Sequence, residues 1–208
     1  MTGNTTTQAS LREFEISGGN LALDFANTVS KRRSDQIEEH LRSYPDLIRW
    51  ARQAGIVSSA DANRISSRTE GHPAEAAKVL QHAIKLREAV FRIFSTIAAH
   101  RKPSNSDLQI LTAAFQDLSR KAELIWTSTG ADWRWTDLGD NLEKILWVVV
   151  RSSLDLLMSS DKDRVRECEA ETCGWLFMDH SKNQSRRWCD MKVCGNREKA
   201  KRFYRRGR

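Results

Sequence analysis

The sequence predicts an α+β protein in which helices dominate and a small cysteine-rich unit lies at the C-terminal end. Apolar residues recur at three- and four-residue steps over much of the first 160 residues, which is the period of an amphipathic helix. All four cysteines, in contrast, lie in the last 41 residues. We therefore expect a helix-dominated N-terminal domain with a β-hairpin at residues 12–160 and a separate C-terminal unit at residues 164–208.

Short elements separated by polar stretches are expected before residue 70. Residues Phe14 to Asp24 fit either a hairpin or a strand that leads into a helix, because two apolar segments flank a pair of glycines. Tyr44 to Ala54 predicts a short helix that ends before a glycine. Val57 to Arg68 predicts a further helix, for which Ser58 or Ser59 is the expected cap.

The strongest helical pattern follows, from about Pro73 to Arg101, where apolar residues recur with helical spacing. Ser106 and Asp107 are expected to cap the next helix. The period then changes, and two β-rich runs on either side of residues 129–131 predict a hairpin. Asp137 to Ser160 returns to a helical pattern. Five tryptophans are interpreted as core or cross-strand residues: Trp50, Trp126, Trp133, Trp135 and Trp147.

The charge is concentrated at one end of the chain. The net charge is +7, but residues 182–208 carry 11 Lys and Arg against two acidic residues, so the rest of the chain is slightly negative. A basic tip on a weakly acidic body indicates a polyanion-binding end. A solvated basic tail is the alternative.

Several classes of protein are disfavoured by the sequence. No apolar run approaches the ~18 residues that a membrane span needs, and the first ten residues lack the apolar core of a secretory signal. We therefore expect a cytoplasmic protein without membrane contact. The sequence shows none of three common signatures of an enzyme: a Ser-His-Asp set, a pair of carboxylates at useful spacing, or a phosphate-binding glycine loop. We therefore do not expect an enzyme.

The cysteines predict one structural zinc site. Cys168 and Cys173 form a C-x4-C pair, 15 residues separate it from the pair Cys189 and Cys194, and cytosolic thiols stay reduced. Two such pairs can bring four thiolates to one tetrahedral Zn²⁺, with no position left open for a catalytic water. Unrelated buried thiols are the alternative, and His180 is expected on the surface of the connector.

The residues around the cysteines indicate a treble-clef-like zinc finger. Residues 175–179 are a strand candidate, residues 181–185 a turn and residues 186–189 a returning strand, after which a helix opens at Cys194. On a helical wheel this helix has one apolar arc, containing Phe203 and Tyr204, which is expected to pack on the metal core. The opposite arc is basic. The candidate nucleic-acid contacts are Arg186, Arg187, Lys201, Arg202, Arg205 and Arg206.

The finger and the first apolar segment resemble a known family. Cys194-Gly195-Asn196-Arg197, preceded by Arg186-Arg187-Trp188-Cys189, resembles the CGNR zinc finger. The run Gly19 to Thr28 and the triplet Leu86-Arg87-Glu88 are similar to the ABATE domain, which precedes that finger in stress-induced bacterial transcription regulators. The resemblance implies an α+β domain of its own fold followed by a finger that binds DNA.

The predicted function is therefore DNA-binding transcription regulation, with a zinc finger that presents a basic helix to double-stranded DNA. The helical body is expected to sense a ligand or to form a homodimer. A protein–protein interaction module is one alternative, against which the charge of the tip argues. RNA binding is the other, with Trp175 and Trp188 as stacking residues if they are exposed. We expect Trp188 beside the metal instead.

Two smaller groups of residues carry further hypotheses. Asp24, Asn27, Thr28 and Arg87 are expected to converge, either to staple the first segment to the long helix or to form a pocket in which Arg87 binds a small acidic effector. Arg197 is expected to orient the finger, through a hydrogen bond near Cys194 or through a pair with Asp179, rather than to contact phosphate.

Overall fold

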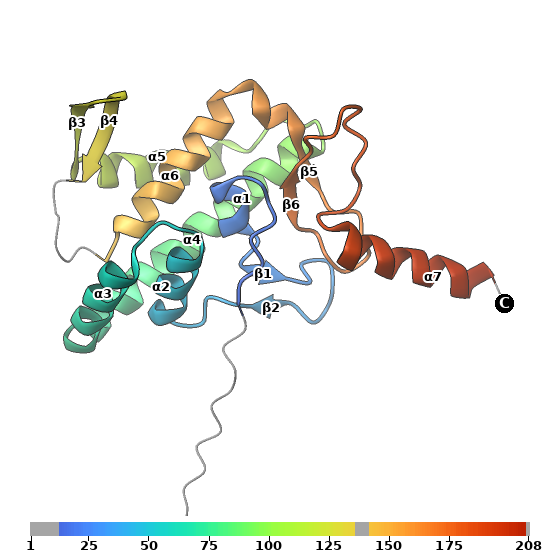
Figure 1. Cartoon of the computed structure of the whole chain (residues 1–208), viewed down its shortest axis with the longest axis horizontal. Coiled ribbons are helices and arrows are strands. Elements are labelled where there is room, and N and C mark those ends of the chain that lie inside the picture. Colours follow the sequence, from blue (N-terminus) through green and yellow to red (C-terminus); the bar gives the residue numbers. More distant parts are fainter. Residues whose placement is uncertain (1–12, 136–141, 207–208) are drawn as a thin grey trace, which may run out of the picture.

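The computed structural model describes residues 13–135 and 142–206 (Figure 1). Its helices and helical turns are α1 (Leu21–Ala26), α2 (Tyr44–Gln53), α3 (Ser59–Gly71), α4 (Pro73–Ala98), α5 (Asn105–Ser119), α6 (Lys144–Met158), the 3-10 turn η1 (Ser160–Arg164), the π-helical turn η2 (Met191–Gly195) and α7 (Asn196–Arg206). Its strands are β1 (Val29–Ser30), β2 (Glu38–Glu39), β3 (Ala122–Thr127), β4 (Gly130–Trp135), β5 (Val165–Glu167) and β6 (Leu176–Met178). They pair as β1–β2, β3–β4 and β5–β6, all antiparallel. The predicted α+β class is confirmed.

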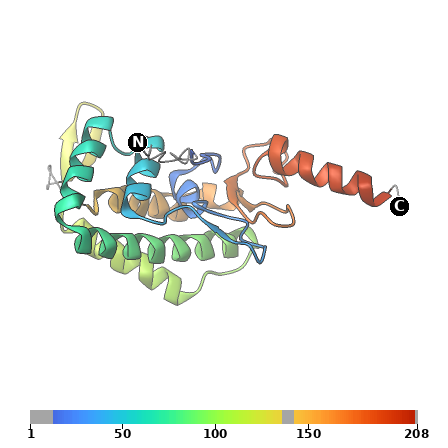
Figure 2. The same ribbon diagram turned by 90° about the horizontal axis from the view of Figure 1, so that it is seen from below.

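Helix α4 is the scaffold of the body (Figures 1 and 2). It contacts α1, α2, α3 and α5 as well as β5, while α6 packs on α1 and α5. Its buried residues recur at the helical spacing seen in the sequence, as Val79, Ala83, Leu86, Val90 and Phe94 show. None of the helices in the described part of the chain is long and apolar enough to cross a membrane.

Polar caps set the starts of three helices. Ser43 and Asp46 form a reciprocal capping box at α2, and Ser58 accepts a hydrogen bond from a backbone N–H of α3. The cap of α5 is Ser104 rather than the predicted Ser106. The Asp107 carboxylate accepts a 2.8 Å hydrogen bond from Ser104, so the cap lies two residues before the predicted one.

The first apolar segment forms α1, so the hairpin alternative is wrong. The helix of the other alternative occurs, but residues 13–17 before it form no strand. The Asn20 side chain accepts a hydrogen bond from the backbone N–H of Ala22 and so caps the helix. Gly19 has a φ of +74°, which allows the sharp turn that leads into it. Helix α1 is buried almost completely, and it packs between α4, α6 and β6.

The β3–β4 hairpin stands at one end of the body (Figure 1). Leu124 pairs with Trp133 in its register, and Trp135 at its base is buried against Trp147. Trp126 is 83% exposed and lies opposite Ala131 in the register, so of the two interpretations it is a cross-strand residue of the hairpin and not a core residue. The predicted start of the last body helix at Asp137 lies outside the described residues, and α6 itself begins at Lys144.

The apolar core of the body continues into the cysteine-rich region. Val165, Leu176 and Met178 from β5 and β6 belong to the same buried cluster as the residues of α1, α4 and α6. A second cluster holds the four cysteines together with Trp175 and Phe177. Alternate residues of β6 therefore face different cores, and this strand joins the body to the metal centre.

Candidate metal centre and nucleic-acid interface

The four cysteines come together as predicted. Their sulfur atoms lie within 4.8 Å of one another, and all four side chains are buried. The Cys173 and Cys189 sulfurs are 3.7 Å apart, as are those of Cys189 and Cys194. Tetrahedral zinc with Zn–S bonds of ~2.3 Å requires S–S separations of about 3.8 Å. The residues therefore fit one structural Zn²⁺, held by Cys168, Cys173, Cys189 and Cys194.

Each knuckle is held by backbone hydrogen bonds. The Cys168 N–H donates to the Trp175 carbonyl at 2.7 Å, which closes the first C-x4-C turn at the start of β6. The π-helical turn η2 presents Cys194, and the Asp190 side chain caps this turn through the Val193 N–H. Hydrogen bonds among the four thiols lower the pKa of Cys168 and raise those of Cys173 and Cys189.

The predicted returning strand at residues 186–189 is wrong. In the described chain β6 pairs with β5, and residues 186–189 form a loop that runs past the first knuckle. The Arg186 side chain fixes this loop by donating to the Trp188 and Cys189 carbonyls, with its guanidinium 4.6 Å from the Phe177 ring centroid. A side chain engaged in this way supports the metal centre, which favours a structural role for Arg186 over a phosphate contact.

The two residues expected to orient the finger act separately. Arg197 donates to the Cys194 sulfur at 3.2 Å and is not paired with Asp179. The Asp179 carboxylate is fully buried and accepts hydrogen bonds from the backbone N–H groups of Ser181 and Arg186, both at 2.9 Å. Burial alone would raise the pKa of Asp179, but these hydrogen bonds outweigh it and hold the pKa below its usual value.

Helix α7 projects from the metal centre away from the body (Figures 1 and 2). Phe203 and Tyr204 are 76% and 74% exposed, with ring centroids 5.9 Å apart. The prediction that this apolar arc packs on the metal core is therefore wrong, because the helix reaches beyond the cluster that it was expected to cover. Trp188 is half-buried against that cluster and Trp175 is buried, so neither is an exposed stacking residue.

The basic residues of the finger differ in how far their charge is compensated. Lys201 pairs with Glu171 at 2.8 Å, and Arg205 lies 3.8 Å from the same carboxylate. Arg187 pairs with Glu169 at 2.6 Å. Arg202 is exposed and has no ion pair among the described residues. The backbone of Arg206 lies at the end of α7, but its side chain is outside the described set.

Asn27 and Thr28, predicted to belong to one group with Asp24 and Arg87, make mainly structural contacts. The Asn27 side chain donates to the Leu176 carbonyl at 2.8 Å and accepts from the Leu176 N–H at 2.9 Å, which joins α1 to β6. The Thr28 hydroxyl donates to the Phe25 carbonyl. Arg87 reaches Thr28 at 3.4 Å, so these residues do staple the first segment to α4.

Arg87 is paired with carboxylates of the chain itself. Its guanidinium makes two hydrogen bonds to the Glu39 carboxylate, at 2.6 and 2.7 Å, and another to Glu88. The residue is only 2% exposed. Burial raises the pKa of Glu88, but the Arg32 and Arg87 guanidinium groups outweigh it and hold the pKa below its usual value. Two carboxylates of the chain already pair with Arg87, which favours the stapling role over the binding of an acidic effector.

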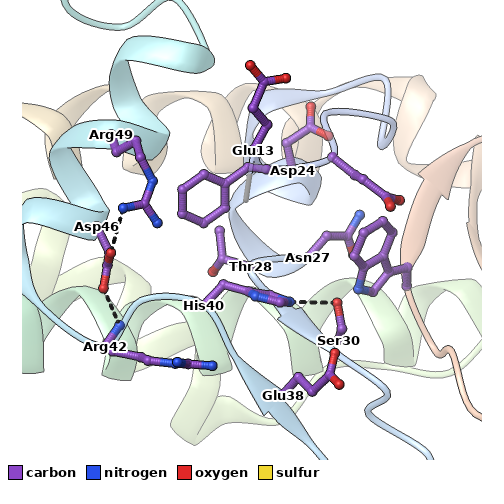
Figure 3. Close-up of a pocket in the computed structure, with 13 residues that line it drawn as sticks. Glu13, Asp24, Asn27, Thr28, Ser30, Glu38, His40, Arg42, Asp46 and Arg49 are labelled. Carbon is purple, nitrogen blue, oxygen red and sulfur yellow. Dashed lines mark hydrogen bonds and ion pairs between the residues drawn. The ribbon is translucent and has the colours of Figure 1, made fainter. Parts of the chain in front are cut away.

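Asp24, Asn27 and Thr28 do line a cavity of about 510 Å³, whose wall also includes Trp175 (Figure 3). The buried Asp24 carboxylate accepts a 2.7 Å hydrogen bond from the Gly18 N–H. Burial raises the pKa of Asp24 to about 6, although hydrogen bonds from the Gly18 and Ser17 backbone oppose the shift. The folded chain thus binds this proton more tightly than the unfolded chain does.

The pKa of Asp24 predicts a pH-dependent stability difference. Between pH of about 4 and 6 the folded state holds more protons, so the free energy of unfolding contributed by Asp24 falls as the pH rises and levels off above that window. Asp24→Asn keeps the acceptor for Gly18 and removes the titration. Urea unfolding at several pH values should show the variant gaining stability relative to the parent as the pH rises through the window. A pH-independent difference would contradict the shift.

The carboxylates that pair with the predicted cationic residues could not be identified from the sequence. Glu39 lies in a charged stretch that resembles any solvated segment, and Glu169 and Glu171 sit inside the first knuckle. Which cation each carboxylate meets depends on the three-dimensional fold. The sequence indicates Trp175 as part of a strand or as a stacking residue, whereas in the structure its indole N–H donates to the Val29 carbonyl at 2.8 Å.

These features define a class of protein: a helical domain that carries a structural four-cysteine zinc finger. Comparison with family models matches residues 19–160 to ABATE, described as "Putative stress-induced transcription regulator", and residues 164–207 to the CGNR zinc finger. The first match covers more than half of the chain, so the chain belongs to the ABATE family, and the predicted resemblance is confirmed. Both descriptions are regulatory or zinc-finger types rather than enzymatic. No curated protein matches the chain.

Proposed function

We propose that this protein is a cytoplasmic, DNA-binding transcription regulator in which zinc holds helix α7 in position to contact double-stranded DNA. The observation that carries the proposal is α7 itself, a helix that extends away from the body (Figure 2). It is basic, and Lys199, Arg202 and Arg205 on it are exposed. Phosphate contacts by Lys and Arg supply much of the affinity of DNA-binding proteins. Residues 12–160 and 164–208 would then act as the regulatory and DNA-contacting parts.

The structure supports a narrower set of phosphate contacts than the sequence did. Arg202 is the strongest candidate, because it is exposed and has no ion pair among the residues described. Lys201 and Arg205 are exposed enough to exchange Glu171 for phosphate, and Arg187 can exchange Glu169. When bound, Zn²⁺ supplies the fold of the finger rather than any chemical step. Arg186 and Arg197 hold the centre in shape.

The body is proposed to sense a ligand or to form a homodimer. Leu124 and Trp126 on the β3–β4 hairpin are 63% and 83% exposed, and an exposed apolar patch of this kind is typical of a protein–protein contact. Phe203 and Tyr204 on α7 are exposed aromatic residues. They favour a second candidate function of the finger, which is binding to a protein or to single-stranded nucleic acid. Competition among duplex DNA, RNA and heparin tests these alternatives.

Removing the cations of α7 is expected to reduce the salt dependence of DNA binding. For duplex DNA, the slope of log K against log[salt] falls by roughly 0.9 for every phosphate that the protein no longer neutralises. Replacing Lys201, Arg202 and Arg205 by alanine should therefore flatten the slope by about 2–3 units, with zinc content unchanged. Fluorescence anisotropy over a series of salt concentrations measures this slope.

A matched control is the triple alanine variant of three exposed cations of the body, Lys78, Lys85 and Arg101, which should leave the slope unchanged. Glu171→Gln provides the reciprocal test. It removes a carboxylate that competes with phosphate for Lys201 and Arg205, so duplex DNA should bind more tightly. Equal binding by the parent and the α7 triple variant at every salt concentration would leave α7 as a solvated face and favour a protein partner.

A further inference from the structure

The cavity beside α1 is acidic. Five carboxylates and two guanidinium groups line it, together with His40 and polar side chains (Figure 3). The five carboxylates are those of Glu13, Glu15, Asp24, Glu38 and Asp46. A volume of about 510 Å³ lies within the range of small-molecule sites. The sign of the lining charge is therefore the first guide to what this cavity accepts.

The charge of the lining is only partly compensated within the chain. Asp46 pairs with Arg49 at 2.9 Å, and Glu38 pairs with Lys31 at 2.7 Å. Glu13, Glu15 and Asp24 have no cationic partner among the described residues. Asp24 is the most informative of the three, because it is only 5% exposed and a buried carboxylate without a cation is costly. A cation that enters the cavity would lower that cost.

An aromatic wall accompanies the carboxylates. Trp175 lines the cavity, and its position is fixed because its indole N–H donates to the Val29 carbonyl. Phe14 lines it as well, but the Arg49 guanidinium already lies 5.2 Å from its ring centroid, so Trp175 is the ring left to a ligand. Aromatic rings attract organic cations, most strongly when water is excluded. Carboxylates next to a rigid aromatic ring form the usual recognition surface for amines.

We propose that this cavity is a binding site for a small organic cation with more than one protonated amine. The charged ends of such a ligand lie against Asp24 and Glu15, and its aliphatic part lies against Trp175. The ligand class is opposite in charge to an acidic effector, for which the uncompensated carboxylates of the cavity are unfavourable. The site does not depend on the DNA-binding proposal, since none of the candidate phosphate contacts lines it.

Titration calorimetry with spermidine tests the proposal on the full-length, zinc-loaded protein. Spermidine is expected to bind with a stoichiometry of one, and the dicarboxylate glutarate is expected not to bind. Glu15→Gln, a change at an exposed position, should weaken spermidine binding about threefold. Asp24→Asn removes a buried charge and should weaken it about 30-fold.

Glu70→Gln is the matched control, because Glu70 is an exposed carboxylate on α3 that does not line the cavity. It should leave the affinity for spermidine unchanged. Absence of spermidine binding at millimolar concentration, or equal weakening by Glu15→Gln and Glu70→Gln, would overturn the proposal. Because Glu15 is exposed, its variant folds and keeps the test valid even if Asp24→Asn is unstable. The Trp175 indole N–H resonance should shift on addition of spermidine, which locates the ligand.

Discussion

Replacing Cys194 by serine is expected to abolish zinc binding and to unfold the finger from the loop at residue 186 to the end of α7. Zinc binding in small fingers contributes on the order of 10–16 kcal/mol to their folding, and α7 begins directly after η2, the turn that holds Cys194. The structure also limits the damage. Val165, Leu176 and Met178 are buried in the core of the body, so β5 and β6 should keep their protection. Elemental analysis and hydrogen exchange resolved by segment measure both effects.

Ser185→Ala is the matched control for this variant, because Ser185 is an exposed residue of the same connector and its side chain has no contact on which the metal centre depends. It should retain one zinc per chain and a protected α7. A Cys194→Ser protein with full zinc content would show that the four cysteines do not share one ion. Loss of protection throughout the body would show that its core is not stable without the metal.

Asn27→Ala is expected to lower the free energy of unfolding by about 4 kcal/mol. The Asn27 side chain satisfies both the N–H and the carbonyl of Leu176, and it is 3% exposed. Alanine leaves two buried backbone groups without partners, and each such group costs ~1–3 kcal/mol. Urea unfolding at a fixed free zinc concentration measures the change.

Asn27→Asp separates the two hydrogen bonds. The carboxylate still accepts from the Leu176 N–H but can no longer donate to its carbonyl, which leaves one backbone group unpaired and adds a buried charge. Asn63→Ala, at an exposed position on α3, is the control and should change the stability by less than about 0.5 kcal/mol. An Asn27→Ala protein as stable as the control would show that the contact between α1 and β6 contributes nothing.

The helices and the metal centre could be predicted because their signals are local. The spacing of Val79, Ala83 and Leu86 fixes the buried face of α4 without reference to the rest of the chain. The cysteine pairs similarly carry their chemistry in their spacing, and all four do meet. Helix α1 belonged to one of two open alternatives, since two short apolar segments around a pair of glycines fit either a hairpin or a strand that leads into a helix.

The failures have a common physical cause, because each depended on what a residue meets across the fold. Residues 186–189 have the composition of a strand, but β5 already pairs with β6, and the Arg186 side chain holds the segment as a loop. The aromatic arc of α7 has the pattern of a packed face, yet the helix extends past the cluster that would cover it. Arg87 was considered as a binding residue for an acidic effector because its partner Glu39 lies 48 residues away in the sequence and could not be identified from it.

The acidic character of the cavity could not be predicted from the sequence either, because its lining comes from segments that are far apart in the chain. Asp24, Asn27 and Thr28 are close in sequence, so their meeting could be expected. Glu38 and Trp175, which also line the cavity, come from β2 and from the finger. The sign of the lining charge therefore emerges only when these separate segments are brought together.

The hydrogen bonds between Asn27 and Leu176, and the shared core around β6, have a consequence for modularity. The finger buries Val165, Leu176 and Met178 against the helical body, so it cannot be transferred to another protein as an independent unit. A chimera that places residues 164–208 behind an unrelated domain would expose these side chains to water and leave Leu176 without its Asn27 hydrogen bonds. Any successful graft must therefore carry the receiving surface of α1 and α4 with it.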